Sequence, residues 1–388
     1  MAEDVIARLA RVEVEGGTAV LRRAWPRARG HLLLEYEGPH GELAAGQWLA
    51  DRAELERVAV ETAAAAAPGD VAVVGRPGSR IVLQRRGADR VLLALRDVMA
   101  QPGSALVSHR AERRALVRLS GQRYARVVRP DRCSRMFASL RTAERLAGGR
   151  FDVPPVLHAD EAGGVAVTGA LQGRSLHRLL AEDSALAAAA AVGRALFELH
   201  SAPALDVPRP HGPAEEAAVV SEWLDRASAH APRLAAPLHA EAAGVRAALS
   251  ALPGCPAVPV HRDFHDKQCL VGPGGRVAML DFDTVTQGDP AVDLANLLVH
   301  VELRSLQGRC TPERARLVAE AIVEAYEPDE GLASRLDAFA DAARLRLACV
   351  YSFRPRWTEL PCALLARLGQ RATDCMTPSS VSAMRASE

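Results

Sequence analysis

Short runs of apolar residues alternate with polar breaks over the first hundred positions of the chain. Residues 17–25 and 31–38 have the composition of strands and are separated by Pro, Arg and Gly. Residues 70–87 form two more strand candidates around the Arg-Pro-Gly-Ser turn at 76–79. Residues 49–67 have a helix-forming composition that ends at Pro68-Gly69. This part is therefore predicted to be a small α/β segment.

A clearer strand pattern starts near Ser104. Residues 104–110, 113–119 and 123–130 are three successive strand candidates, and a tight Ser-Gly-Gln joins the last two, as is typical of a hairpin. A helix candidate follows at 135–148, and one more strand candidate at 164–171. We expect a small antiparallel sheet with one helix.

Beyond residue 175 nearly every apolar run has the length and composition of a helix. Helices are predicted over 184–200, 213–252 (as one helix or two), 290–308, 311–326, 332–353 and 360–372. Thr311 followed by Pro312 is typical of the first positions of a helix. The predicted fold class is therefore α+β, with a small antiparallel β lobe followed by a mostly helical part.

One irregular segment, residues 258–298, interrupts the helical part. Two apolar strand candidates on either side of the Gly-Pro-Gly-Gly turn at 272–275 predict a hairpin. The hairpin would bring the residues before its first strand beside those that end its second. Oxygen-bearing side chains that converge in this way suit Mg²⁺. The four side chains concerned are Asp263, Gln268, Asp281 and Asp283.

Three blocks of this segment occur in a fixed order. The first is His-x-Asp followed five residues later by an amide residue, Gln268; the second is Asp281-Phe282-Asp283; the third is Gly-Asp-Pro-x-x-Asp-Leu-x-Asn at 288–296. Together they resemble the aminoglycoside phosphotransferase and choline kinase group, relatives of the protein kinases. The resemblance covers about residues 104 to 370 and leaves the first hundred residues outside the family pattern.

The resemblance implies a two-lobed, protein-kinase-like fold. The expected units are an N-terminal cap-like α/β segment at 1–100, a nucleotide-binding lobe at 101–170, and a helical lobe at 171–388 with the catalytic loop and the acceptor site. The implied activity is Mg²⁺-dependent transfer of the γ-phosphate of ATP to a hydroxyl of a small molecule, which could be aminoglycoside-like, an amino alcohol or a sugar. The alternatives are a non-catalytic, pseudokinase-like nucleotide-binding protein and a maltokinase-like sugar kinase.

The resemblance also assigns roles to single residues of the catalytic segment. Asp263 would orient the acceptor hydroxyl and take its proton, as expected for phosphoryl transfer. Asp281, with Asp283 beside it, would hold Mg²⁺, and Gln268 would be the second metal ligand at a position where the family usually has Asn. His261 is expected to be a structural residue that holds the loop.

A basic residue on the third strand is expected to reach the nucleotide phosphates. The family uses lysine there, whereas this chain offers Arg126, with Arg129 as the alternative. Arginine binds phosphate in a bidentate manner, so the function can survive. Glu144 on the next helix is the expected partner of Arg126. Residues 108–113 stand where a glycine-rich phosphate loop would be but contain no glycine, and residues Thr168 to Leu171 would form the hinge that meets the adenine.

Composition singles out one further residue. The chain has 48 basic residues, of which only Lys267 is a lysine, and it lies four positions after Asp263. It is expected either to meet the γ-phosphate or to be a surface lysine left by chance.

Charge is unevenly spread along the chain. Residues 1–150 carry 26 Arg against 17 acidic residues, and residues 281–388 carry 12 Arg against 16 acidic residues. Solvated faces explain this imbalance, or else a nucleotide phosphate near the first part and a cationic acceptor further on. A group of acidic residues could line such an acceptor pocket or form a solvated helical face: Glu302, Glu324, Glu327, Asp329 and Glu330.

The same composition argues against several other classes of protein. No lysine-rich tract or aromatic platform indicates nucleic-acid binding. The chain starts without the apolar core of a secretory signal, and its longest small-apolar run, 185–193, is too short to span a bilayer. Seven scattered cysteines without a Cys-x-x-Cys pair favour a reducing, cytoplasmic location. The expected partners are a nucleotide and a small hydroxyl compound, with no nucleic acid and no membrane, and the pattern leaves the oligomeric state open.

Overall fold

A six-stranded antiparallel sheet forms the first part of the chain in the computed structural model, which describes residues 4–372. Its strands lie in the order β1-β2-β3-β4-β6-β5. The bounds are β1 Arg11–Val14, β2 Gly17–Ala28, β3 His31–Glu37, β4 Leu43–Leu49, β5 Val71–Val74 and β6 Ile81–Gln84, with helices α1 Val5–Leu9 and α2 Arg52–Ala64. We call residues 4–88 the cap.

Burial alternates along β2, whereas β3, β4 and β6 are buried along most of their length. In β2, Ala19 and Leu21 are buried whereas Val20 and Arg22 are exposed. The strands predicted at 17–25 and 31–38, and the pair around 76–79, are confirmed. Strands β1 and β4 were not predicted, and the helix predicted from residue 49 begins only at Arg52, because Leu49 ends β4.

A second, five-stranded antiparallel sheet forms the small lobe, in the order β10-β11-β9-β8-β7. Helix α3 covers one face, where Leu95 and Val98 pack with Val117 and Val127. Helix α4 packs at the other side through Met136. The bounds are α3 Ala94–Met99, β7 Ala105–Arg110, β8 Arg114–Leu119, β9 Arg123–Val128, α4 Cys133–Ala147, β10 Val156–Asp160 and β11 Val165–Gly169, with the 3-10 turn η1 Pro130–Arg132. The predicted sheet is confirmed. Strand β10 and helix α3 were not predicted.

The remainder of the described chain is a helical lobe that carries two small ribbons. Its helices are α5 Leu176–Leu179, α6 Ala185–His200, α7 Pro213–His230, α8 Pro232–Ser250, α9 Ala291–Leu306, α10 Pro312–Tyr326, α11 Glu330–Ala333, α12 Leu336–Tyr351 and α13 Leu360–Leu365. The strands are β12 Arg174–Ser175, β13 Val258–Val260, β14 Cys269–Val271, β15 Val277–Met279 and β16 Thr286–Gly288, with 3-10 turns η2 Pro273–Gly275, η3 Phe282–Thr284 and η4 Pro355–Trp357.

Most helical predictions hold in this lobe, but the helix predicted at 360–372 ends at Leu365, and the one predicted at 332–353 spans Leu336–Tyr351. The segment 213–252 forms two helices, and the Thr311 hydroxyl accepts a hydrogen bond from the Arg314 amide at the start of α10. The predicted hairpin exists as the antiparallel pair β14–β15. In the part of the chain that the structure describes, no helix combines the length and the apolar character needed to cross a bilayer.

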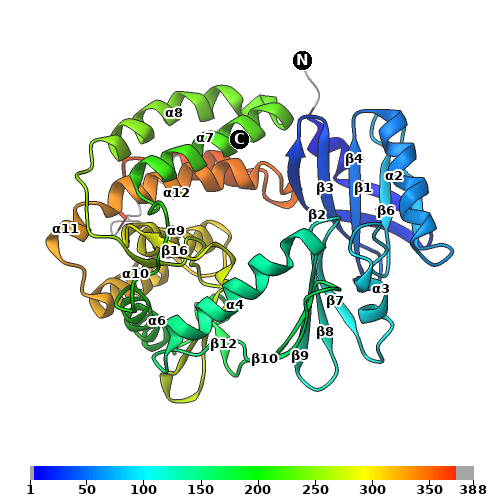
Figure 1. Cartoon of the computed structure of the whole chain (residues 1–388). Coiled ribbons are helices and arrows are strands. Elements are labelled where there is room, and N and C mark those ends of the chain that lie inside the picture. The colour runs from blue at the N-terminus through cyan, green and yellow to red at the C-terminus, as the bar shows by residue number, and fades with distance from the viewer. Residues whose placement is uncertain (1–3, 373–388) are drawn as a thin grey trace.

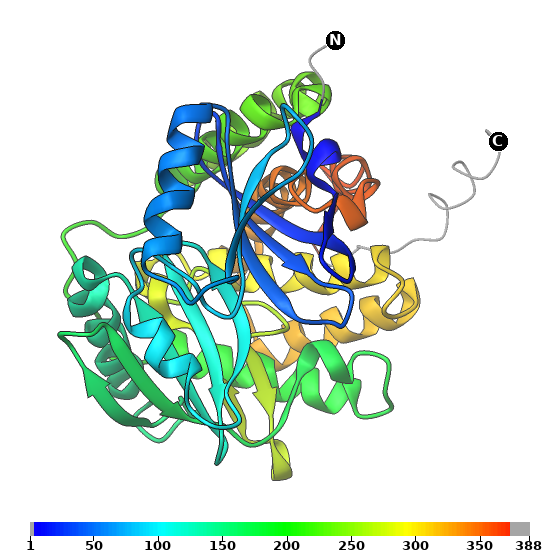
Figure 2. The same ribbon diagram turned by 90° about the vertical axis from the view of Figure 1, so that its right-hand side faces the viewer.

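The cap contacts both lobes. Figure 1 shows the helices of the helical lobe on the left, the two sheets with α2 and α3 on the right, and α4 between them. In Figure 2 the cap sheet faces the viewer, with the cyan strands of the small lobe below it. The Ala24 amide of β2 donates to the Phe353 carbonyl just after α12, at 2.9 Å, and Asp4 pairs with Arg233 of α8 at 2.9 Å. One hydrophobic cluster runs from Val5 in the cap to residues of the helical lobe.

Candidate active site

A buried carboxylate on α9 fixes the start of the catalytic loop, residues 261–268. The two oxygens of Asp293 accept hydrogen bonds from the backbone amides of His261 and Arg262, each at 2.6 Å. His200 of α6 contacts the same carboxylate through Nε2 at 3.2 Å. Because Asp293 is fully buried, these charge-assisted bonds hold the loop firmly against the helix.

His261 holds the loop from inside, as the sequence indicated for a structural residue. Its ring is buried, and Nε2 lies 2.8 Å from the Leu280 carbonyl, so this nitrogen carries the proton. Nδ1 then accepts from the Asp263 amide at 3.3 Å. Asn296 of α9 adds a bond from its side-chain amide to the Phe264 carbonyl, at 2.8 Å. Asp263 therefore sits on a rigid loop, with its side chain half-buried.

The segment with Asp281 and Asp283 lies directly beside this loop. The Leu280 amide donates to the Gln268 carbonyl at 2.9 Å, and the Thr284 hydroxyl donates to the His261 carbonyl at 2.9 Å. The structure thus brings together the two ends of the hairpin that the sequence placed side by side. Asp281 has a positive φ of 59°, an uncommon conformation for this residue type that is frequent at functional sites.

Two arginines of the small lobe reach across to these acidic residues. Arg126 of β9 pairs with Asp283 and, at 3.4 Å, with Asp281. Arg114 of β8 pairs with Asp283 at 2.9 Å and lies 3.9 Å from Asp281. Arg114 was not singled out from the sequence, although its place directly after the loop at 108–113 was a usable signal.

The predicted ion pair between Arg126 and Glu144 is wrong. Within the described residues, the carboxylates that pair with Arg126 are those of Asp281 and Asp283. Glu144 is exposed, because the buried face of α4 is formed by residues such as Ala143 and Leu146. The helix therefore turns the Glu144 side chain away from the strand.

The donor set at the meeting point fits Mg²⁺. Asp281, Asp283 and Gln268 offer carboxylate and amide oxygens, the ligands that this ion prefers. Burial alone would raise the pKa of Asp281, but Arg114, Arg126 and His261 outweigh it and lower the pKa below its ordinary value. The carboxylate is therefore ionised, as a metal ligand must be.

The phosphotransferase enzyme family model, APH, matches residues 2–339. The chain belongs to the phosphotransferase enzyme family. The resemblance inferred from the motifs is therefore confirmed, as are the α+β class and the two-lobed, kinase-like fold. The matched range includes the first hundred residues, so the expectation that they lie outside the family pattern is wrong. No curated protein matches the chain.

Solved structures with similar folds have low sequence identity to this chain. Aminoglycoside phosphotransferase APH(3'')-Id from Streptomyces rimosus is 21% identical over 64% of this chain and 97% of its own, with a TM-score of 0.46. A choline/ethanolamine kinase family protein from Mesorhizobium loti is 21% identical over 72% and 91%, with a TM-score of 0.48. A glucosamine kinase is 20% identical over 95% and 97%, with a TM-score of 0.47.

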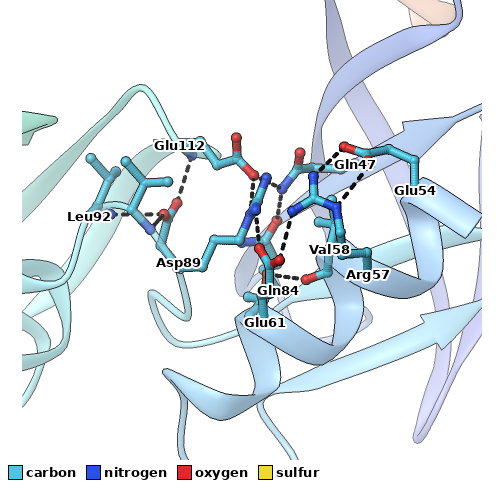
Figure 3. Close-up of polar contacts among 12 residues, drawn as sticks. Gln47, Glu54, Arg57, Val58, Glu61, Gln84, Asp89, Leu92 and Glu112 are labelled. Carbon is cyan, nitrogen blue, oxygen red and sulfur yellow. Dashed lines mark hydrogen bonds and ion pairs between the residues drawn. The ribbon is translucent and has the colours of Figure 1, made fainter.

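The turn between β7 and β8 departs from a flexible phosphate loop. At its tip Glu112 has a positive φ of 58°, and its buried carboxylate faces the cap. It pairs with Arg27 at 2.5 Å and Arg90 at 2.7 Å and accepts from the Gln47 amide at 3.1 Å. Figure 3 shows this carboxylate beside Gln47, with the Glu112 amide donating to Asp89 at 2.7 Å. The cap therefore holds the turn by a buried polar cluster.

The residues expected to form the hinge, Thr168 to Leu171, lie at the end of β11 and directly after it. Thr168 pairs with Tyr124 inside the sheet, and the Ala170 amide donates to the Gln122 carbonyl at 2.8 Å. An open cavity of about 430 Å³ lies at this end of the small lobe, with Tyr124, Gln122 and Ala170 among its lining residues. Leu171 follows directly, so the expected hinge adjoins a space beside the sheet.

The side chain of Lys267 is exposed near the end of the catalytic loop. Its neighbour Asp266 is fully buried and accepts two hydrogen bonds from Arg304, at 2.7 and 2.9 Å. Asp266 also lies close to His265 and His300 in a group that could hold a metal ion. Because Arg304 already occupies both of its oxygens, we assign Asp266 to the framework of the loop.

The acidic residues considered for a cationic acceptor pocket do not form one together. Glu302 is buried and pairs with Arg344 at 3.0 Å. The Asp329 carboxylate accepts from the Leu332 amide and so caps α11, while Glu324 and Glu330 are exposed. The described structure favours the solvated helical face for Glu324, Glu327, Asp329 and Glu330. Glu302 fits neither interpretation, because it is buried in an ion pair.

Proposed function

We propose that this chain transfers the γ-phosphate of ATP to a hydroxyl group of a small molecule, with Mg²⁺ as the cofactor. The observation that carries the proposal is the clamped loop: Asp293 and Asn296 fix the backbone on either side of Asp263, while the Asp263 side chain remains accessible. A protein that only bound a nucleotide would have no need to position a proton acceptor in this way.

The residues of this chain have distinct roles in the proposed reaction. Asp263 orients the acceptor hydroxyl and accepts its proton as phosphoryl transfer proceeds. Arg126, with Arg114 beside it, provides positive charge for the nucleotide phosphates once they arrive. Gln268, Asp281 and Asp283 would hold Mg²⁺, which neutralises phosphate charge when bound. The hinge from Thr168 to Leu171 would meet the adenine.

The proposed reaction does not by itself decide the class of acceptor. Aminoglycoside-like compounds, amino alcohols and sugars, the last as in a maltokinase-like enzyme, all offer the required hydroxyl. A screen of ATP consumption over compounds from each class, with and without Mg²⁺, assigns the class. A cytoplasmic location, where ATP and Mg²⁺ are both present, completes the proposal.

A second candidate function is nucleotide binding without catalysis. The observation that favours it is the pairing of both acidic residues: Asp281 and Asp283 already contact Arg114 and Arg126. The absence of glycine from residues 108–113, and the orientation of Glu112 toward the cap, point the same way.

Replacement of the proposed base separates the two candidates. We expect Asp263→Ala to lower the rate of Mg²⁺-dependent phosphate transfer by roughly 10²- to 10⁴-fold, the usual contribution of a positioned general base. Nucleotide affinity should persist, because Asp263 meets the acceptor rather than the nucleotide. Transfer rates and calorimetric nucleotide binding are measured side by side, with Asp225→Asn, an exposed change on α7, as the control. An unchanged transfer rate, or no transfer by the parent protein, would favour the binding protein.

A further inference from the structure

Two hydrogen bonds link helix α12 to the peptide that follows Asp263. The guanidinium of Arg346 on α12 donates through Nη2 to Oδ1 of Asn296 on α9, at 2.6 Å. The Nδ2 group of Asn296 then donates to the Phe264 carbonyl, at 2.8 Å. Phe264 directly follows Asp263 in the catalytic loop. A residue of α12 is therefore connected to the peptide next to the proposed base.

Arg346 decides which way the Asn296 amide faces. A side-chain amide can present either its oxygen or its nitrogen to a neighbour, whereas a guanidinium carries only donors. Arg346 must therefore meet the oxygen, which leaves the nitrogen toward the Phe264 carbonyl. Asn296 is buried, so loss of the guanidinium would take away the donor that its oxygen has, and with it the reason for this orientation.

A buried carboxylate of α7 helps to hold Arg346 in place. One oxygen of Glu216 lies 3.8 Å from Nε of Arg346, and the other lies 2.8 Å from Nε2 of His211. The backbone of His211 is itself tied to β16 and the residue after it. Its amide donates to the Gln287 carbonyl at 2.8 Å, and its carbonyl accepts from the Asp289 amide at 2.9 Å. The guanidinium is half-buried, where charge is less screened than at the surface, so contacts with α7 and α9 fix it on two sides.

The two clamps on the catalytic loop have separate supports. Asp293 holds the two amides that precede Asp263, whereas Asn296 holds the carbonyl that follows it. Loss of Arg346 would leave the first clamp intact and free only the peptide after Asp263. The arginines that would bind the nucleotide phosphates lie on β8 and β9, outside this loop. The effect of Arg346 should therefore fall on the proposed base and not on nucleotide binding.

Building on the proposed function, we propose that Arg346 is a positioning residue for the reaction. Through the Asn296 amide it fixes the peptide that follows Asp263, and so the direction in which the Asp263 carboxylate meets the acceptor hydroxyl. Arg346 acts through Asn296 rather than by contact with a substrate. Because a displacement of about 1 Å in a catalytic group can slow a reaction roughly 100-fold, a residue that only holds the loop can matter greatly for the rate.

The test separates turnover from nucleotide binding in the full-length protein. Arg346→Met keeps much of the side-chain length but removes its donors, whereas Arg346→Lys keeps a donor at its end. ADP release from MgATP is measured with streptomycin, ethanolamine and glucose, one acceptor from each class. Arg346→Met should lower the turnover number by roughly 10- to 100-fold, and Arg346→Lys should recover most of it. The calorimetric affinity for a non-hydrolysable ATP analogue should stay unchanged in both variants.

Two further variants distinguish positioning from a general loss of stability. In an Asn296→Leu background, Arg346→Met should lower the turnover number no further, because the path to the loop is already cut. Arg344→Lys is the matched control, since Arg344 lies two residues earlier on α12 and pairs with Glu302 and Asp341. It should lower the urea midpoint without lowering the turnover number of the folded protein. An equal fall in turnover for Arg344→Lys and Arg346→Met, or additive effects in the Asn296→Leu background, would overturn the inference.

Hydrogen exchange keeps this inference separate from the proposed function. Backbone amides of residues 263–268 should exchange faster in Arg346→Met than in the parent protein and return toward the parent rate in Arg346→Lys. Faster exchange in Arg346→Met, with no transfer by the parent to any acceptor, would support the link to the loop and count against the proposed function alone. Transfer by the parent, with unchanged turnover and unchanged exchange in Arg346→Met, would overturn the inference and leave the proposed function standing.

Discussion

Asp293 shows at the scale of a single residue how the catalytic loop is held in place. Its carboxylate lies in the first turn of α9, and each oxygen accepts one backbone amide of the loop. We expect Asp293→Asn to remove the charge and to set an amide group against one of these donors. The free energy of unfolding should fall by about 1.5–3 kcal/mol, the value of a hydrogen bond to a charged group.

Activity should fall together with stability in this variant, because a shift of about 1 Å in a catalytic group can cost roughly 100-fold in rate. Urea unfolding and transfer kinetics measure the two effects. The exposed change Asp225→Asn should leave both unchanged. Parent-like stability and activity in Asp293→Asn would show that the loop holds its shape without this clamp.

Individual residues also show which contacts could be predicted from the sequence and which could not. The meeting of Asp263, Gln268 and Asp281 could be predicted, because a hairpin fixes which residues lie beside each other. The partner of Arg126 could not, because its choice depends on which way α4 turns Glu144. Lys267 was noticed through composition alone.

At the scale of elements, the β7–β8 turn depends on the cap. Glu112 has a charged partner on each side, Arg27 and Arg90, and its carboxylate is buried. We expect Glu112→Gln to keep the shape of the side chain but to lose these charge-assisted bonds, at a cost of about 1.5–3 kcal/mol in unfolding free energy. Backbone amides from Ser108 to Arg114 should then exchange hydrogen faster, since the turn loses its attachment.

Hydrogen exchange followed by mass spectrometry checks the Glu112→Gln prediction. Glu56→Gln is the matched control, because Glu56 is exposed on α2 and its pairing with Arg52 is a surface contact, which contributes little. Faster exchange in both variants, or in neither, would contradict the assignment of Glu112 as the attachment point.

Two of the strands missed from the sequence, β4 and β10, lack a pattern of burial on one face, whereas β1 was missed although its burial alternates. Strand β4 is buried along most of its length, so its residues do not alternate between apolar and polar, and it contains Gly46. Strand β10 lies at the sheet edge with an exposed centre, so it lacks an apolar face. The short helix α3 has only two buried side chains, Leu95 and Val98. Burial on both faces, as in β4, or on neither, as in β10, leaves no alternating pattern in the sequence to predict a strand from.

At the scale of the whole molecule, the arginines of the first 150 residues, which outnumber the acidic residues there, lie in two kinds of place. Some of these side chains form surface pairs on α2, as Arg52 does with Glu56 and Arg57 with Glu54. Others face the catalytic segment, where Arg114 and Arg126 meet Asp281 and Asp283. The sequence offered solvated faces and anion binding as alternatives. The pairs on α2 belong to a solvated face, whereas anion binding by Arg114 and Arg126 stays a prediction.

The sharing of one hydrophobic cluster between the cap and the helical lobe predicts how the protein unfolds. Leu32, Leu34 and Tyr36 of β3 belong to the same cluster as Leu347 of α12, whereas the small lobe has a cluster of its own. We expect the cap and the helical lobe to unfold in a single cooperative transition, because neither keeps a complete core alone.

Two tryptophans report on each part: Trp25 and Trp48 in the cap, and Trp223 and Trp357 in the helical lobe. Urea titrations of the double variants W25F/W48F and W223F/W357F isolate the two signals, and circular dichroism of each variant corrects for any change in its stability. Within each variant the fluorescence midpoint should equal the dichroism midpoint, whereas a cap signal that is lost at lower urea would identify the cap as a separately folding unit.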